Sequence, residues 1–332
     1  MAPSPALAEI LGEAAPLDRA AERSRRLELR GSAERHGRLV ELAAQLAGMG
    51  GIGPDAAVRL VAFAGEHGLA ARDVSPLEPS AAPRRAALLA DGRGALGAAA
   101  GALGLGIEVV ADALPKDSGL PGAGALPAGG APDREDAMDE ATFEAALRTG
   151  AARAEALSEA GVGLAVPHLV GPGGRVAALA FAGHLLDEEP VAMLGFSGTD
   201  DALWSRQVAA LRDVMTRARA TPTDPAELVR RLLAPHQAVA VGFLARLAAL
   251  GIPTLVSSAE AAALGLAAEL LSPGARGWLL GGQLAPAGGL AAIYSRLGIR
   301  PVFALHADDS LGAGALAAVP LVRFAAALGA ED

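Results

Sequence analysis

The sequence predicts an α/β protein in which a parallel sheet is flanked by helices. Short apolar runs alternate with longer amphipathic or Ala-rich segments along most of the chain. This alternation is typical of parallel strands joined by right-handed helical crossovers. Hydrophobic residues make up 52% of the 332 residues, enough for a large core. Because aromatic residues make up only 3%, that core must consist mainly of Ala, Leu and Val.

Short apolar runs are expected to form the strands, at residues 58–65, 106–111, 162–166, 191–195, 254–256, 277–280 and 301–305. Helices are expected at residues 5–48, with a loop at 30–37 between two of them, and at 84–104, 139–157, 202–219, 224–250, 259–271 and 315–328. Pro235 and Pro320 should interrupt or kink two of these helices, because proline lacks the amide that a helix interior needs. Parallel sheets bind ligands at the carboxyl ends of their strands, so the loops after the runs are the first candidates for a site.

Composition limits the partners and the chemistry that the chain allows. Its net charge of −9 argues against a nucleic acid or an anionic membrane as partner, since either needs a basic face. The absence of cysteine excludes disulfides, thiolate metal sites and cysteine nucleophiles. No group of His, Asp and Glu has the spacing of a metal site, and no cofactor is expected. The N-terminus does not read as a signal peptide and the apolar run 94–107 is too short to cross a bilayer, so we expect a cytoplasmic protein.

Loops of small residues follow several of the predicted strands, at 171–174, 195–198, 281–289 and 310–314. The first of them places Gly171, Gly173 and Gly174 before a helix that begins near Arg175. A helix N-terminus beside a guanidinium is a suitable cradle for a phosphate. A plain tight turn is the alternative, because neither a P-loop nor a G-x-G-x-x-G pattern is present.

Motifs spread along the chain match those of one enzyme family. They are residues 17–21, 37–49, 63–68, 74–75, 135–138 and 300–321, of which the last aligns to the family pattern without a gap. On these motifs the chain resembles the nicotinate-nucleotide:dimethylbenzimidazole phosphoribosyltransferases, which build the lower-ligand nucleotide of cobalamin. The resemblance implies a Rossmann-like α/β domain (51–299), a small helical domain from both termini (1–50 and 300–332) and a homodimer.

Against the same family, this chain has replaced residues that carry the chemistry. The family's general-base glutamate is Leu311 here, and its second glutamate is His168. An aspartate of the family is Ser257, and an arginine is Asp308. Because an apolar Leu311 cannot accept a proton, general-base catalysis in the family's manner is not expected, and neither is the family's own reaction.

The resemblance and the new polar residues together predict a site. Its catalytic residues are expected to be His168, His306 and Asp308, the last two as an acid–base pair. The donor's phosphate is expected to bind Gly171, Gly173, Gly174, Arg175, Ser197 and Gly198. The acceptor is expected to bind Ser75, Asp309, Leu311 and Gly312. His184 and His236 fall in helical segments and are interpreted as structural.

The sequence therefore predicts a glycosyltransferase that acts on small molecules. It would move a sugar from a phosphate-activated nucleotide or nucleotide-sugar donor to a nitrogen or sulfur of a small heteroaromatic acceptor. The resemblance implies an inverting displacement, and an acceptor that is already nucleophilic would not need the lost glutamate. Relatives of the family that attach a sugar to the sulfur of ergothioneine in antibiotic biosynthesis suggest such an acceptor. An authentic phosphoribosyltransferase acting on a benzimidazole-like base, and a non-catalytic ligand-binding homologue, are the alternatives.

Overall fold

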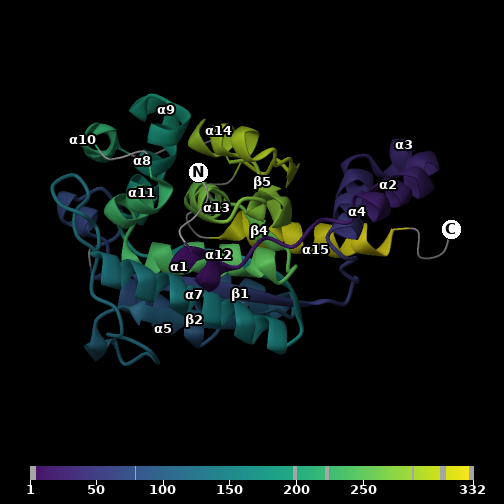
Figure 1. Ribbon diagram of the computed structural model, residues 1–332, viewed down its shortest axis with the longest axis horizontal. Helices are drawn as coiled ribbons and strands as arrows, with labels where there is room; N and C mark the ends of the chain where they lie inside the picture. The colour runs from purple at the N-terminus through teal and green to yellow at the C-terminus, as the bar shows by residue number, and fades with distance from the viewer. Residues whose placement is uncertain are drawn as a thin grey trace.

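A computed structural model describes residues 5–78, 80–196, 200–220, 224–285, 288–306 and 312–328, except for the side chains of Ser32 and Glu34. In these residues a single sheet contains the strands β1 (Ala57–Gly65), β2 (Gly106–Ala113), β3 (Val162–Val170), β4 (Thr254–Val256), β5 (Leu279–Gln283) and β6 (Pro301–Phe303). Their order in the sheet is β2-β1-β3-β4-β5-β6, and every neighbouring pair is parallel. The predicted α/β class with a parallel sheet is therefore confirmed (Figure 1).

Most of the described helices pack around this sheet, and a group of them extends beyond it (Figure 1). They are α1 (Pro5–Leu11), α2 (Arg19–Glu28), α3 (Ala33–His36), α4 (Arg38–Gly48), α5 (Ala81–Ala90), α6 (Gly94–Ala102), α7 (Glu140–Glu159), α8 (Gly174–Leu186), α9 (Pro190–Leu194), α10 (Asp201–Arg219), α11 (Pro225–Leu232), α12 (Pro235–Ala249), α13 (Ala259–Leu271), α14 (Gly288–Leu297) and α15 (Ala313–Ala327). Short 3-10 helices form at Leu29–Ser32, Gly68–Arg72, Lys116–Ser118 and Ala275–Trp278. The loop predicted at 30–37 is therefore wrong, because a 3-10 helix and α3 cover most of it. As expected, Pro235 separates α11 from α12, whereas α15 continues through Pro320 without interruption.

The strand predicted at 191–195 is wrong. These residues belong to α9, which begins at Pro190 and ends before Gly195. Proline is favoured in the first turn of a helix, and an apolar run of this length fits a buried helical turn as well as a strand. The loop at 195–198 therefore follows a helix and not a strand. The strand predicted at 277–280 begins instead at Leu279, after a 3-10 helix.

The order of the strands locates the part of the sheet where a ligand is expected. From β1 the chain moves to β2 on one side, and β3 lies on the other side of β1. The direction of winding thus reverses between β1 and β3. In open parallel sheets, ligands bind at the carboxyl ends of the strands beside such a reversal. The carboxyl ends of β1 and β3 are Gly65 and Val170.

Helix α12 carries its amino end to this same edge, and its position depends on close packing against α7. A Cβ atom on Gly150 of α7 would lie 2.0 Å from the Val239 carbonyl oxygen. A Cβ atom on Gly242 of α12 would lie 2.4 Å from the Leu147 carbonyl oxygen. Only glycine permits the two helix backbones to approach so closely. The first turn of α12 is therefore held at the end of β1.

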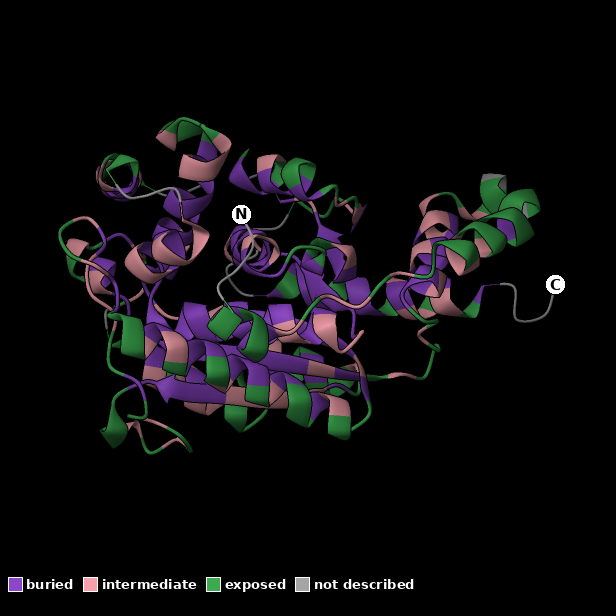
Figure 2. Ribbon diagram, viewed as in Figure 1, coloured by how far each residue is buried: buried purple, intermediate pink, exposed green. Residues whose placement is uncertain are grey.

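A helical arm made of α2, α3, α4 and the end of α15 projects away from the sheet (Figure 1). Its outer face is exposed, and its inner face is buried (Figure 2). The Arg25 guanidinium donates to the Leu328 carbonyl, which joins α2 to α15. By contrast, α1 packs against α7 and α12. The predicted division into domains at residues 50 and 300 stays a prediction. None of the described helices is long and apolar enough to cross a membrane.

Candidate active site

The candidate active site begins at a small cavity beside the strands β1 and β3, at the carboxyl end of β4. Its volume is about 10 Å³, room for about one water molecule. The residues that line it are Leu60, Val166, Pro167, His168, Ser257, Ser258, Gly312 and Ala315. The cavity therefore brings together His168 and Gly312, which the sequence assigned to catalysis and to the acceptor. It also contains Ser257, one of the replaced family positions.

His168 lies inside β3 and not in the loop after it, because β3 continues to Val170. Its side chain is buried, and burial together with the nearby Arg85 charge lowers its pKa to about 4. The imidazole Nδ1 is 3.1 Å from the place that a Cβ atom on Gly312 would occupy. At neutral pH this histidine is uncharged, so it can donate or accept a hydrogen bond but is a weak base.

The predicted phosphate loop follows the end of β3 and is packed tightly against β1. A Cβ atom on Gly171 would lie 2.2 Å from the Gly65 carbonyl oxygen. The residue that follows β3 must therefore be glycine for the two backbones to approach so closely. Gly173 has a φ of 89° and is the N-cap of α8. The helix therefore starts where the sequence placed it, with Arg175 in its first turn.

His236 occupies the space next to Gly171. It is 2% exposed, and neither ring nitrogen has a hydrogen-bond partner among the described residues. Its ring packs on Gly65, where an added Cβ would lie 2.6 Å away. Burial, and then the charge of His67, lowers the His236 pKa to about 3. A buried ring without partners is a group that a ligand or a water molecule could satisfy.

A carboxyl group lies at the amino end of α8, in the position where a phosphate was expected. Glu260 Oε1 accepts a hydrogen bond of 2.7 Å from Gln237 Nε2, which also donates to the Gly174 carbonyl oxygen at 2.9 Å. A Cβ atom on Gly174 would be 2.5 Å from Glu260 Oε1. Burial raises the Glu260 pKa to about 7, against the opposing effects of Gln237 and Arg175. This carboxyl group can therefore gain or lose a proton near neutral pH.

Two other predicted site residues, Ser75 and His306, lie outside the cavity lining. Ser75 is partly buried, and its hydroxyl oxygen accepts a 3.1 Å hydrogen bond from the Leu77 amide. His306 is exposed after β6 and has a φ of 57°. The predicted residues Ser197, Gly198, Asp308, Asp309 and Leu311 lie outside the described residues. Within the described ranges, no group of His, Asp and Glu could hold a metal ion.

Sequence reasoning missed three residues of the candidate site that lie near the phosphate loop, His236, Gln237 and Glu260. His236 was interpreted as structural because it falls in a helix, yet the fold places the start of that helix at the end of β1. Gln237 and Glu260 do not fall in any of the motifs that the chain shares with the family. The available hint was that Glu260 stands in the first turn of a helix that follows a strand, since the first turns of such helices face the ligand edge.

Comparison with known proteins identifies relatives over most of the chain. A family model described as a phosphoribosyltransferase matches residues 15–331. The nicotinate-nucleotide–dimethylbenzimidazole phosphoribosyltransferase of Mycobacterium avium (strain 104) is 36% identical over 274 residues, covering 81% of this chain and 78% of that enzyme. The enzyme of the same name from Mycobacterium ulcerans (strain Agy99) is 34% identical over 304 residues, covering 88% and 83%.

Solved structures agree with these sequence relatives. The crystal structure of CobT from Thermus thermophilus matches with a TM-score of 0.81 and 26% identity, over 96% of this chain and 95% of that chain. A second structure from the same organism, titled as the nicotinate-nucleotide–dimethylbenzimidazole phosphoribosyltransferase, matches with a TM-score of 0.80 and 25% identity, over 94% and 96%. Motifs, fold and sequence identity together establish that the chain belongs to the nicotinate-nucleotide–dimethylbenzimidazole phosphoribosyltransferase family.

Proposed function

We propose that the chain transfers a phosphoribosyl group from a nicotinate-nucleotide-type donor to a ring nitrogen of a small heteroaromatic base. Family membership supports phosphoribosyl transfer over the wider class of sugar transfers that the sequence alone predicted, and this proposal replaces the expectation that the family's own reaction is lost. The observation that carries the proposal is the position of His168, a buried neutral imidazole that lines the cavity and lies near the carboxyl end of β3, beside the reversal of the sheet.

The proposed reaction is an inverting displacement at the anomeric carbon of the sugar. A lone pair on the acceptor nitrogen forms the new bond while the bond to the leaving group breaks, and that group departs with the electron pair. The acceptor's second ring nitrogen then carries an acidic proton that must be removed. A weak base is enough for such a proton, so neutral His168 could accept it even with a pKa of about 4.

Positioning would supply much of the catalysis in this scheme. The tight turn at Gly171 to Gly174 and the guanidinium of Arg175 lie at the amino end of α8, where a donor phosphate would meet the positive end of the helix dipole. Glu260 would have to be protonated, or be displaced, when a dianionic phosphate binds there. Because the Glu260 pKa is about 7, protonation of this carboxyl group costs little free energy at neutral pH.

A sulfur acceptor is the second candidate function. It is favoured by the weak basicity of His168 and by an apolar Leu311 at the family's general-base position. A thione or thiolate sulfur is nucleophilic without a base, so S-glycosylation of an ergothioneine-like acceptor from a nucleotide or nucleotide-sugar donor needs no glutamate. The two functions differ in the atom that attacks and in the class of donor, and they share the same edge of the sheet.

The test is a product assay on the purified full-length chain. It is incubated with nicotinate mononucleotide and dimethylbenzimidazole, and separately with nucleotide sugars and ergothioneine, and products are identified by mass spectrometry. Under the proposal the first mixture yields a ribosylated base, and His168→Ala lowers kcat at least ten-fold with a smaller change in KM. The same substitution at His184, near the other end of α8, is the matched control and should leave kcat unchanged.

Each other result of this assay has a defined meaning. Product only in the second mixture would replace the proposal with sulfur transfer. An absence of product in both mixtures, with tight binding of a donor in calorimetry, would favour a non-catalytic ligand-binding homologue. The homodimer implied by the family is tested separately, by light scattering during size-exclusion chromatography.

A further inference from the structure

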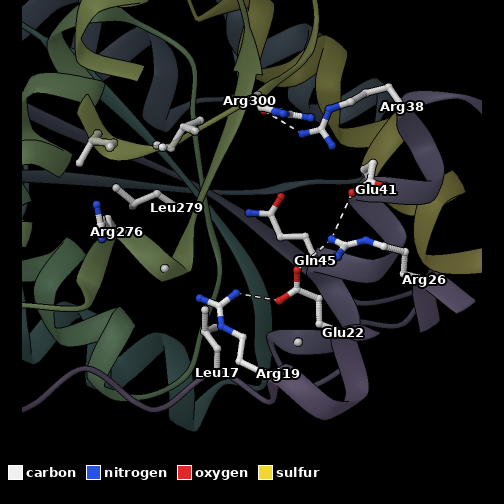
Figure 3. A pocket seen from close by; sticks show the side chains of 15 residues that line it. Leu17, Arg19, Glu22, Arg26, Arg38, Glu41, Gln45, Arg276, Leu279 and Arg300 are labelled. Carbon is white, nitrogen blue, oxygen red and sulfur yellow. Dashed lines mark hydrogen bonds and ion pairs between the residues drawn. The ribbon is translucent and has the colours of Figure 1, made fainter. Parts of the chain in front are cut away.

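A second cleft opens at the opposite edge of the sheet from the candidate active site. Its volume is about 740 Å³, and it lies between the helical arm and the amino ends of β5 and β6 (Figure 3). We call it the arginine cleft, after the five arginines that line it, Arg19, Arg26, Arg38, Arg276 and Arg300. Leu279 begins β5 in this cleft, and at about 3.3 Å per residue the five residues of β5 separate it from the carboxyl edge by about 13 Å.

The charge of the cleft is opposite to that of the whole chain. Five arginines and two glutamates line it, so its formal charge is 5 − 2 = +3, whereas the chain carries −9. A concave surface of one sign with low-dielectric walls concentrates its electric field and attracts counter-ions. The volume falls in the range of about 300–1,000 Å³ that is usual for small-molecule sites.

Three of the five arginines are matched by carboxylates. Glu22 pairs with Arg19 at 2.7 Å and with Arg26 at 3.1 Å, and Arg26 also reaches Glu41 at 3.1 Å. Arg276 lies 3.6 Å from Glu269, which is outside the cleft lining. Arg38 and Arg300 are the two arginines of the cleft that form no ion pair among the described residues, although the Glu41 charge also acts on Arg38.

Arg38 and Arg300 form the unmatched side, where they lie close together (Figure 3). The Arg38 guanidinium donates to the carbonyl oxygens of Arg300, at 3.0 Å, and Pro301, at 3.4 Å, and to no carboxylate among the described residues. The Arg300 side chain forms no ion pair or hydrogen bond within the same described ranges. Burial, and then the charge of Arg300, lowers the Arg38 pKa, while the charge of Glu41 acts in the opposite direction.

The remaining lining residues define the rest of the ligand. Gln45 points into the cleft between the two sides and offers both a donor and an acceptor (Figure 3). Leu17, Leu279, Leu297 and Ile299 supply apolar walls. Guanidinium groups bind phosphate oxygens in pairs, so two of them suit a dianionic phosphate. We propose that the arginine cleft binds a small organic phosphate, with the phosphate between Arg38 and Arg300 and the apolar body on the leucine side.

This proposal is independent of the reaction proposed above, because the two sites lie at opposite ends of the strands. Calorimetric titration of the full-length chain with phenyl phosphate, inorganic phosphate and phenol tests it directly. Phenyl phosphate should bind most tightly, inorganic phosphate more weakly, and phenol not measurably. Phenol binding as tightly as phenyl phosphate would show that charge is not the determinant and would overturn the proposal.

Substitutions of the arginines in this cleft test whether phenyl phosphate binds there. The double variant R38Q/R300Q should weaken phenyl phosphate binding at least ten-fold and leave the basal transferase activity unchanged. Arg276→Gln is the matched control, since Arg276 lines the same cleft but is paired, and it should change the affinity less than three-fold. Arg300→Gln alone removes no described interaction, so it should fold normally and still weaken binding.

Arg175→Ala separates the two edges of the sheet. If phenyl phosphate binding survives R38Q/R300Q but is lost in Arg175→Ala, the phosphate binds at the candidate active site and the arginine cleft is not a phosphate site. If binding survives all of these variants, the proposal is also wrong. Loss in R38Q/R300Q with retention in Arg175→Ala supports it, whatever the product assay shows.

Discussion

The carboxyl group of Glu260 allows a direct test of the electrostatics at the candidate active site. Its pKa is raised from 4.5 to about 7, mainly because burial penalises the charged form. In the unfolded chain the same group ionises near its ordinary pKa of 4.5. Below pH 4.5 both states hold the proton, and folding is unaffected. Between pH 4.5 and about 7 the unfolded chain ionises more readily, so stability falls as pH rises.

The size of this loss follows from the two pKa values. They differ by about 2.5, and each pH unit corresponds to about 1.4 kcal/mol. The free energy of unfolding should thus be lower by up to about 3 kcal/mol above pH 7 than it would be without this carboxyl group. Glu260→Gln removes the charge and keeps an oxygen that can accept from Gln237. The variant should match the wild type at pH 4 and exceed its stability by up to about 3 kcal/mol at pH 8.

Urea unfolding at several pH values between 4 and 8.5 measures this difference. Glu140→Gln is the control, because Glu140 is an exposed carboxylate in the first turn of α7, and it should give no comparable gain at pH 8. A stability difference between Glu260→Gln and wild type that is the same at pH 4 and pH 8 would refute the reasoning. It would mean that the Glu260 carboxyl is ionised as readily in the folded chain as in water.

Three further predictions concern the loops of the site. Gly171→Ala should lower the unfolding free energy by about 2 kcal/mol or more, because the new Cβ would clash with a carbonyl of β1, whereas Gly101→Ala has open space in α6 and should be neutral or stabilising in the same urea experiment. Arg175→Ala should weaken donor binding by about 1.5–3 kcal/mol, and an unchanged calorimetric Kd would exclude this contact. Asp308→Asn and Asp309→Asn should raise the acceptor KM more than they lower kcat, and unaltered acceptor kinetics in both would remove this loop from the predicted site.

The fold could largely be predicted because its strongest signals are local. Residues 58–65 form an apolar run of strand length, and all but one of the residues of β1 after Val58 are buried. The error at 191–195 arises where local signals are ambiguous: so short a run cannot show a helical period, and only Pro190 marks the start of α9. Element boundaries shifted for the same reason, as at Leu279, where a 3-10 helix leads into β5.

The site was less predictable because it depends on distant segments meeting. His168 and Gly312 were found through motif resemblance, and the fold does bring them to one cavity. Nothing in the residues around His236 distinguishes it from a histidine buried in any helix. Its role in the site depends on where α12 begins relative to β1 and β3. Glu260 likewise gains its altered pKa only from burial in the folded chain.

The contact between α7 and α12 has a consequence for how this site can change its substrate. Nearly every residue of α12 is buried, and the paired glycines Gly150 and Gly242 leave no gap between the two helix backbones. Gly242 is six residues from His236, a distance of about 9 Å along the helix axis. The His236 end of α12 therefore cannot slide or rotate to suit a new ligand unless α7 moves as well. Adaptation to a different acceptor must come from side-chain replacement at fixed backbone positions, or from the loops that follow the strands.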